Sequence, residues 1–160
     1  MLNILPDAEI DTLIHEAKTV PNGLCPLTKQ IERNQHWRRD FDVTSASGNA
    51  FVISTRQSML NVLNFSAILG YRMPGLNTIF RLCRYNGKHE HTNTIEDERF
   101  RDFHIHIATE RYQRRGSRED HFARMDNRYA TLDGAIECLL MDCGFGFDPP
   151  AKNLSLFPGL

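Results

Sequence analysis

Short runs in which apolar and polar residues alternate, separated by turn-forming residues, constrain this chain to an antiparallel sheet more than any other feature. Residues 37–43 form one such run, which ends in Phe41 and Val43 and is typical of a half-buried strand. Ser45-Ala46-Ser47-Gly48-Asn49 has the composition of a hairpin loop, and Ala50–Thr55 is the expected returning strand. A short loop joins neighbouring strands that run in opposite directions, so the first two strands predict an antiparallel pair.

Further strands follow along the chain. Residues 59–73 fit either a helix or a strand, and we predict a strand because asparagines and a glycine weaken the helical alternative. Thr78–Tyr85 is another expected strand, ended by Asn86-Gly87. Residues 88–102 have the composition of a polar, mobile loop, and residues 103–108 alternate again as a strand.

Helices are predicted at the two ends of this region. Pro6-Asp7-Ala8-Glu9 is a typical helix start, because proline fits the first turn and acidic residues suit the positive end of the helix dipole. Thr131 is the expected cap of a second helix that runs to Asp142. Both helices carry an apolar stripe: Ile10, Leu13, Ile14 and Ala17 in the first, and Leu132, Ile136, Leu139 and Leu140 in the second. We therefore predict an α+β fold with one mainly antiparallel sheet of about five strands and helices on one face. Residues 1–145 would form a single domain and residues 146–160 an extended tail.

Four of the seven histidines occur as two close pairs, His89-Glu90-His91 and His104-Ile105-His106. Imidazole titrates near neutral pH, so it serves as an acid, a base or a metal ligand with little adjustment. Because side chains alternate along a strand, His104 and His106 should project from the same side. Phe103, Ile105 and Ile107 would then face the core, and we expect the two imidazoles on a face that opens to solvent or to a cleft.

Downstream residues could complete an active site. If the strand continued to Glu110, this carboxylate would lie on the same face as His104 and His106. Arginines follow at 111, 114, 115 and 118, beside Tyr112. Arginine forms paired hydrogen bonds to phosphate, and tyrosine can stack on a base. Such a run is also compatible with a solvated surface loop.

Three functions remain open on these residues. The first is a metal-independent ribonuclease, in which one imidazole takes the 2′-hydroxyl proton and another protonates the leaving oxygen. The second is a metal-dependent hydrolase, since two His-x-His units offer four nitrogens to an ion such as Zn²⁺, Mn²⁺ or Ni²⁺. The third is a non-enzymatic interaction protein, such as an antitoxin or a phage-encoded inhibitor of a host defence system.

Charge and cysteine content limit the partners and the compartment. The formal charge is −1, from 19 basic and 20 acidic residues, so nucleic-acid binding would require a local patch. The N-terminus lacks the pattern of a signal peptide, no apolar run has the length of a membrane span, and the four cysteines show no Cys-x-x-Cys spacing. We therefore predict a cytoplasmic protein with reduced thiols and no membrane partner.

The run His91-Thr92-Asn93, followed by the strand of His104 and His106 with Glu110 and Tyr112 behind it, resembles the signature of an uncharacterised family of small proteins from bacteria and mobile elements. The resemblance covers most of residues 5–145 and excludes His89. The layout is also similar to the toxin ribonucleases of toxin–antitoxin systems. We accordingly predict an RNA-binding, RNA-cleaving protein of the toxin-like kind, without a cofactor or metal ion, and with a cognate protein as a further partner. The expected catalytic residues are His91, His104, His106 and Glu110, and the expected substrate-binding residues are Asn93, Arg111, Tyr112, Arg114 and Arg115.

Overall fold

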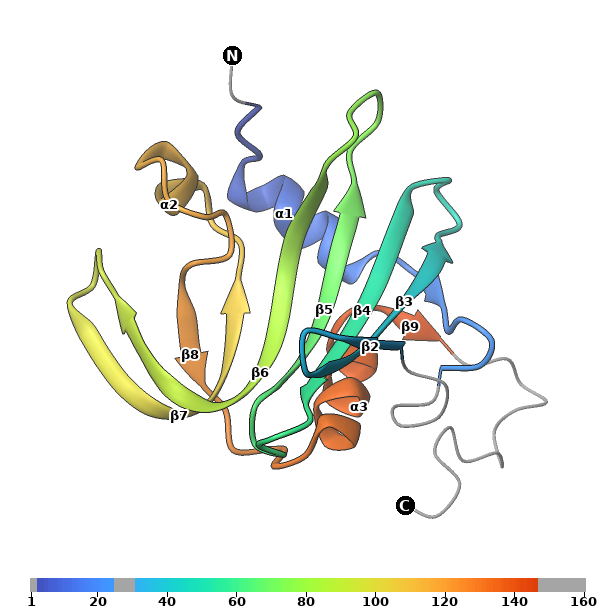
Figure 1. The fold of residues 1–160 in the computed structure, drawn as a ribbon. Coiled ribbons are helices and arrows are strands. Elements are labelled where there is room, and N and C mark those ends of the chain that lie inside the picture. Colours follow the sequence, from blue (N-terminus) through green and yellow to red (C-terminus); the bar gives the residue numbers. More distant parts are fainter. Residues whose placement is uncertain (1–2, 25–30, 147–160) are drawn as a thin grey trace.

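The computed structural model describes residues 3–24 and 31–146 (Figure 1). The elements are α1 (Asp7–His15), β1 (Lys18–Thr19), β2 (Ile31–Arg33), β3 (His36–Thr44), β4 (Ala50–Ser58), β5 (Phe65–Arg72), β6 (Ile79–Asn93), β7 (Glu98–Ile107), α2 (Glu110–Arg114), β8 (Ala123–Met125), α3 (Leu132–Asp142) and β9 (Phe145–Gly146). The fold is α+β, as predicted. The predicted tail lies outside the described residues from 147 onward.

Within these ranges the main sheet has seven strands, more than the expected five, and each strand pairs antiparallel with the next in the order β2-β3-β4-β5-β6-β7-β8. The predicted first hairpin is confirmed, because β3 pairs with β4 from His36 opposite Ser58 to Thr44 opposite Ala50. The strand predicted within residues 59–73 is confirmed as β5. Its alternate residues Phe65, Ala67, Leu69 and Tyr71 are buried in the core, which explains why strand pairing prevails over the mixed local signal.

The two predicted terminal helices are confirmed, and both pack on the same face of the sheet. Ile10 and Leu13 of α1 and Ile136 and Leu139 of α3 belong to one buried cluster with the inward-facing residues of β4 and β5. Thr131 caps α3, since its hydroxyl accepts a hydrogen bond of 3.1 Å from the backbone of Gly134. The opposite face of the sheet is left free of helices α1 and α3, and it carries the site described below. No helix in the described ranges is both long and apolar enough to cross a membrane.

The structure corrects the prediction of a loop over residues 88–102. β6 continues to Asn93 and β7 begins at Glu98, so most of this segment forms a long hairpin that bends away from the central strands (Figure 1). The predicted strand end at Asn86-Gly87 is a β-bulge between Asn86 and His89. Gly87 is required there, because a Cβ atom at this position would lie 1.8 Å from the carbonyl oxygen of Leu63.

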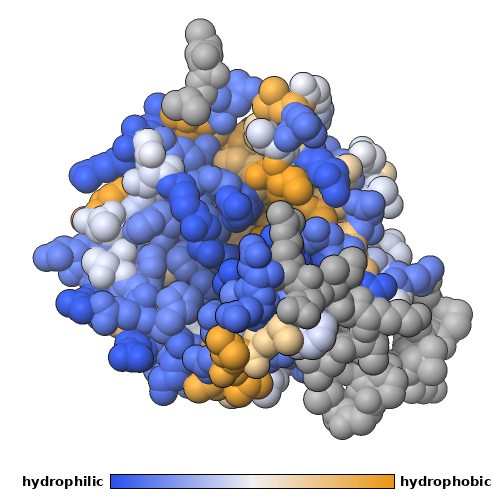
Figure 2. All heavy atoms as spheres, in the orientation of Figure 1, coloured by the Kyte–Doolittle hydropathy of each residue, from blue (hydrophilic) through white to orange (hydrophobic). Residues whose placement is uncertain are grey.

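The tip of the β6–β7 hairpin is fastened to the rest of the molecule. The Asn93 side chain donates to the Ala123 carbonyl at 2.7 Å and accepts from the Ala123 amide at 2.9 Å, as a neighbouring strand would. The Ile95 amide donates to the Tyr112 hydroxyl, which donates to Glu96 at 2.6 Å. These bonds hold the hairpin against β8 and α2, so that its inner side is covered. The surface over this region is mostly hydrophilic (Figure 2).

Candidate metal centre

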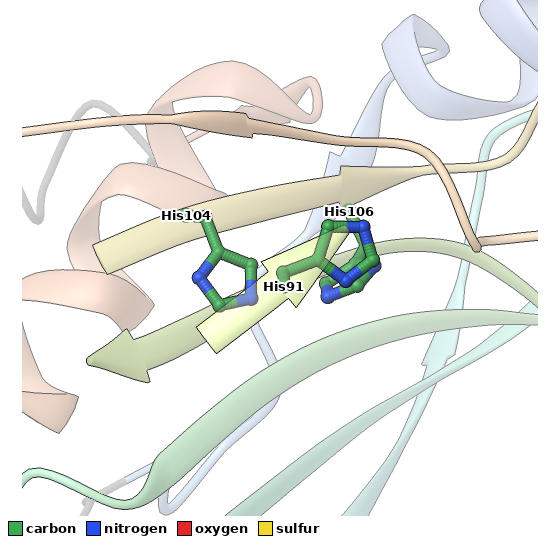
Figure 3. Close-up of side chains that lie close together, drawn as sticks. All are labelled: His91, His104 and His106. Carbon is green, nitrogen blue, oxygen red and sulfur yellow. The ribbon is translucent and has the colours of Figure 1, made fainter. Parts of the chain in front are cut away.

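Three imidazoles converge on the inner side of the β6–β7 hairpin (Figure 3). His91 comes from β6, and His104 and His106 come from β7. One nitrogen of each ring lies within 4.8 Å of the corresponding nitrogens of the other two. The bulge produces this arrangement: it inserts one residue into β6, so that His91 pairs with Phe100 and shares a face with His104 and His106.

We expected His104 and His106 on a face that opens to solvent or to a cleft, but the structure buries both side chains. His104 is 0% exposed and His106 is 4% exposed, because the curled hairpin covers them. Ile105 is buried on the opposite face, as predicted, whereas Phe103 and Ile107 are half-buried. The histidines are nevertheless not in apolar surroundings, since they contact one another and polar groups of β6, β7 and the segment before β8.

Backbone carbonyls fix the ring orientation of both β7 histidines. The Nδ1 atom of His104 donates to the Asp102 carbonyl at 2.7 Å, and Nδ1 of His106 donates to the Asp120 carbonyl at 2.8 Å. A carbonyl only accepts, so Nδ1 of each neutral ring carries the hydrogen and Nε2 keeps its lone pair. Nε2 of His104 is buried and has no hydrogen-bond partner.

The tautomer of His91 follows from its neighbour Asn93. The two bonds of Asn93 with the main chain of Ala123 fix which end of the amide is oxygen. Oδ1 therefore accepts the hydrogen bond of 3.0 Å that joins it to His91 Nε2, which leaves the lone pair of His91 on Nδ1. The predicted substrate-binding Asn93 is fully buried and acts on the site by orienting His91.

Two more histidines adjoin the three. The His89 ring lies 4.5 Å from that of His104 between centroids, and the His121 ring lies 5.1 Å from that of His91. His89 was excluded from the family signature, and His121 was not identified from the sequence. A lone histidine before β8 carries no local signal, because only the hairpin closure brings it to His91.

Burial keeps the clustered imidazoles uncharged. Desolvation lowers the pKa of His104 to about 4 and that of His106 to about 2, and the charge of Arg84 lowers the pKa of His106 further. Desolvation also lowers the pKa values of His89 and His91. Near neutral pH these rings are therefore in the form that binds metal ions.

A buried ion pair lies beside the cluster. The Arg84 guanidinium is 3.1 Å from the carboxylate of Asp120, whose side chain is 0% exposed, and Arg84 is paired with His106 in the β6–β7 ladder. Neither residue was identified as a site residue from the sequence. Asp120 thus anchors His106 through its carbonyl and Arg84 through its carboxylate.

The remaining predicted site residues lie elsewhere. The strand ends at Ile107, so Glu110 begins α2 instead of extending the histidine face, and its carboxylate accepts hydrogen bonds from Arg114. Arg111 pairs with Glu96 at 2.6 Å. Tyr112 is 0% exposed, so its ring has no free face on which a base could stack. Arg115 is exposed at the end of α2.

A comparison with family models identifies the chain. The model of a family of unknown function, DUF6978, matches residues 5–131. The protein belongs to this family. The match includes all three converging histidines, Arg84 and Asp120. No curated protein and no solved structure matches the chain.

Proposed function

We propose that this member of DUF6978 is a metal-dependent hydrolase whose divalent ion is held by His91, His104 and His106. The observation that carries the proposal is the convergence of three imidazoles, with one nitrogen of each ring within 4.8 Å of one nitrogen of the other two. The hydrogen bonds of these rings leave a lone pair free on each of them. Hydrogen bonding of the distal ring nitrogen to a carbonyl or side chain is the usual support of metal-binding histidines.

The geometry fits a transition-metal ion after a small adjustment. Nitrogens that bind Zn²⁺ at about 2.0–2.1 Å in a tetrahedral site are about 3.3 Å apart. Nitrogens within 4.8 Å of one another reach this spacing if each moves toward their common centre by at most about 0.9 Å. Three protein ligands leave one position open, which is the pattern of catalytic and not of structural zinc sites.

The metal-dependent reaction accounts for the site better than the metal-independent ribonuclease does. Acid–base cleavage requires one imidazole to be charged while the other is neutral. The lowered pKa values of His104 and His106 make both rings neutral near pH 7. In addition, Glu110 and Tyr112, the other expected members of the ribonuclease site, lie outside the cluster.

Other groups of the chain would hold the ligands in place and attract the substrate. A bound ion of this kind lowers the pKa of a coordinated water and polarises the bond to be hydrolysed. The carbonyls of Asp102 and Asp120 hold the two β7 rings, and Asn93 holds His91. Arg84 places a positive charge next to the ligands, where it would attract an anionic substrate.

Elemental analysis tests the proposal. The protein, purified without chelator and dialysed, should carry about one zinc, manganese, iron or nickel ion per chain. His91→Gln should lose this ion, because the substitution removes one of the three imidazole ligands. The glutamine amide can still form a hydrogen bond with Asn93, so the fold should be preserved. His15→Gln, at an exposed histidine of α1, should retain it.

Activity decides between the candidate functions. Hydrolysis of bis-p-nitrophenyl phosphate that is abolished by EDTA and restored by the ion would support the proposal. Cleavage of RNA that persists in EDTA would instead support the metal-independent ribonuclease. If the protein carries no bound ion and hydrolyses no substrate, the proposal is overturned, and a protein that acts through a partner is favoured.

A further inference from the structure

A groove lined by arginines lies on the sheet face opposite α1 and α3. It has a volume of about 300 Å³ and is formed by outward-facing residues of β3, β4, β5 and β6 together with Arg118. On β4 the groove is lined by Thr55 and by Val52, Ser54 and Arg56, and the last three alternate with core residues of the same strand. The arginines of the groove are Arg38, Arg56, Arg81, Arg84 and Arg118.

Positive charge exceeds negative charge in this groove. Arg38 is 3.8 Å from Asp40 and Arg81 is 3.7 Å from Glu119. Arg84 and Arg118 share the single carboxylate of Asp120.

Arg56 is the least compensated of the five. It is half-buried, and it has no carboxylate within 4.0 Å in the part of the chain that the structure describes. Burial and the neighbouring charge of Arg38 both lower its pKa. Like charges gathered in a partly desolvated groove are unfavourable unless an anion compensates them, and guanidinium groups are particularly suited to phosphate.

Arg84 joins this groove to the histidine cluster. Its side chain lines the groove, and its position is paired with His106 in the sheet, so the two side chains are neighbours on one face. The charge of Arg84 also acts on His89, His91 and His104.

We infer that the arginine groove is the substrate-binding subsite of the proposed metal centre, and that it takes a small phosphorylated molecule whose phosphate group lies beside Arg84. The inference rests on the proposed function and names the class of its substrate.

The size and lining of the groove favour a small ligand over an RNA strand. About 300 Å³ is at the lower end of the range for small-molecule pockets. No aromatic side chain is among the residues that line it, whereas grooves that bind single-stranded nucleic acid generally stack bases on aromatic rings. Ser54 adds a hydroxyl and Val52 and Ile68 add apolar surface, which suits a phosphate attached to a compact organic group.

Calorimetric titration of metal-free, EDTA-dialysed protein with inorganic pyrophosphate tests the groove separately from the metal. We expect one binding site, with affinity that falls as salt concentration rises. Arg56→Gln should weaken binding about ten- to a hundredfold, as expected for one charged hydrogen-bond donor. Arg115→Gln removes the same charge from an exposed position outside the groove and should leave binding unchanged.

Three results would overturn the inference: no pyrophosphate binding, equal weakening by Arg56→Gln and Arg115→Gln, or tight binding only of a single-stranded RNA dodecamer. Metal content of the same variants separates the two proposals. Pyrophosphate binding by a protein that never acquires a metal ion would refute the metal centre and leave the groove as an anion site. A metal ion retained by Arg56→Gln, together with weakened pyrophosphate binding, supports both.

Discussion

Acidification should destabilise the metal-free protein well before its carboxylates become protonated. In the folded state His104 and His106 are buried and have pKa values of about 4 and about 2, whereas an unfolded histidine has a pKa near 6.5. The unfolded chain therefore binds more protons below this value. The stability that these neutral rings provide is complete above about pH 6.5 and is lost as the pH falls toward the folded pKa values.

The size of the effect follows from the shift. Between pH 7.5 and pH 5.0, each of the two histidines should lower the free energy of unfolding by about 2 kcal/mol, at 1.36 kcal/mol per pKa unit. The two contributions together reach about 4 kcal/mol, a large part of the stability of a typical domain. Ordinary carboxylates, with pKa values near 4, contribute little in this interval.

Urea unfolding in EDTA at a series of pH values provides the measurement. His104→Gln should reduce the loss between pH 7.5 and pH 5.0 by about 2 kcal/mol, because one titrating group is removed. His15→Gln, at a mostly exposed histidine of α1, is the matched control for the loss of a histidine side chain. A free energy of unfolding that varies by less than about 1 kcal/mol over this interval, or a His104→Gln profile parallel to that of the parent, would refute the burial argument.

Three other substitutions test how the fold supports the site. Asn93→Leu should lower the free energy of unfolding by about 2–3 kcal/mol in urea titrations, because it leaves the main chain of β8 without its two buried partners. Lys18→Met should cost about 3 kcal/mol in the same assay, since the buried ammonium donates to three backbone carbonyls next to the ends of α1 and α3, and these would lose their donor. Gly87→Ala should lower the melting temperature and the bound metal together, because its Cβ would displace Leu63 at the bulge that aligns His91. Gly146→Ala, where an added Cβ meets nothing within 4 Å, is the matched control and should change neither.

Residues with a regular apolar period could be placed from the sequence. The stripes of α1 and α3 and the alternation of β3 and β4 were predicted because one side of each element is buried in the core and the other is polar. That contrast is the signal on which periodicity depends. Glu110 was predicted on the same strand as His104 and His106. The prediction was wrong because the strand ends at Ile107 and Thr109 caps a new helix, α2.

The β6–β7 hairpin lacked this signal. Residues 88–93 are polar at every position, because one side of this strand faces solvent and the other faces the histidine cluster. A strand that is polar on both sides has the composition of a loop, and only its pairing with β7 distinguishes the two. The arginine groove was missed because its members come from separate segments, whereas Arg111, Arg114 and Arg115 are adjacent in sequence and are placed on α2 or at its end.

The chemistry of the histidines depends on contacts between residues that are far apart in the sequence. Strand periodicity was sufficient to place His104 and His106 on one side of β7, but it could not tell an exposed pair from a buried one. Their burial comes from the hairpin tip, through bonds between Asn93 and Ala123 across 30 residues. An exposed pair would keep pKa values near 6.5 and could divide acid and base work at neutral pH. A buried pair with fixed Nδ1 donors stays neutral and keeps two lone pairs, and with His91 it forms the ligand set of the metal ion that we propose. The closure of the hairpin is therefore the feature on which the proposed metal-dependent reaction rests, in preference to the metal-independent one.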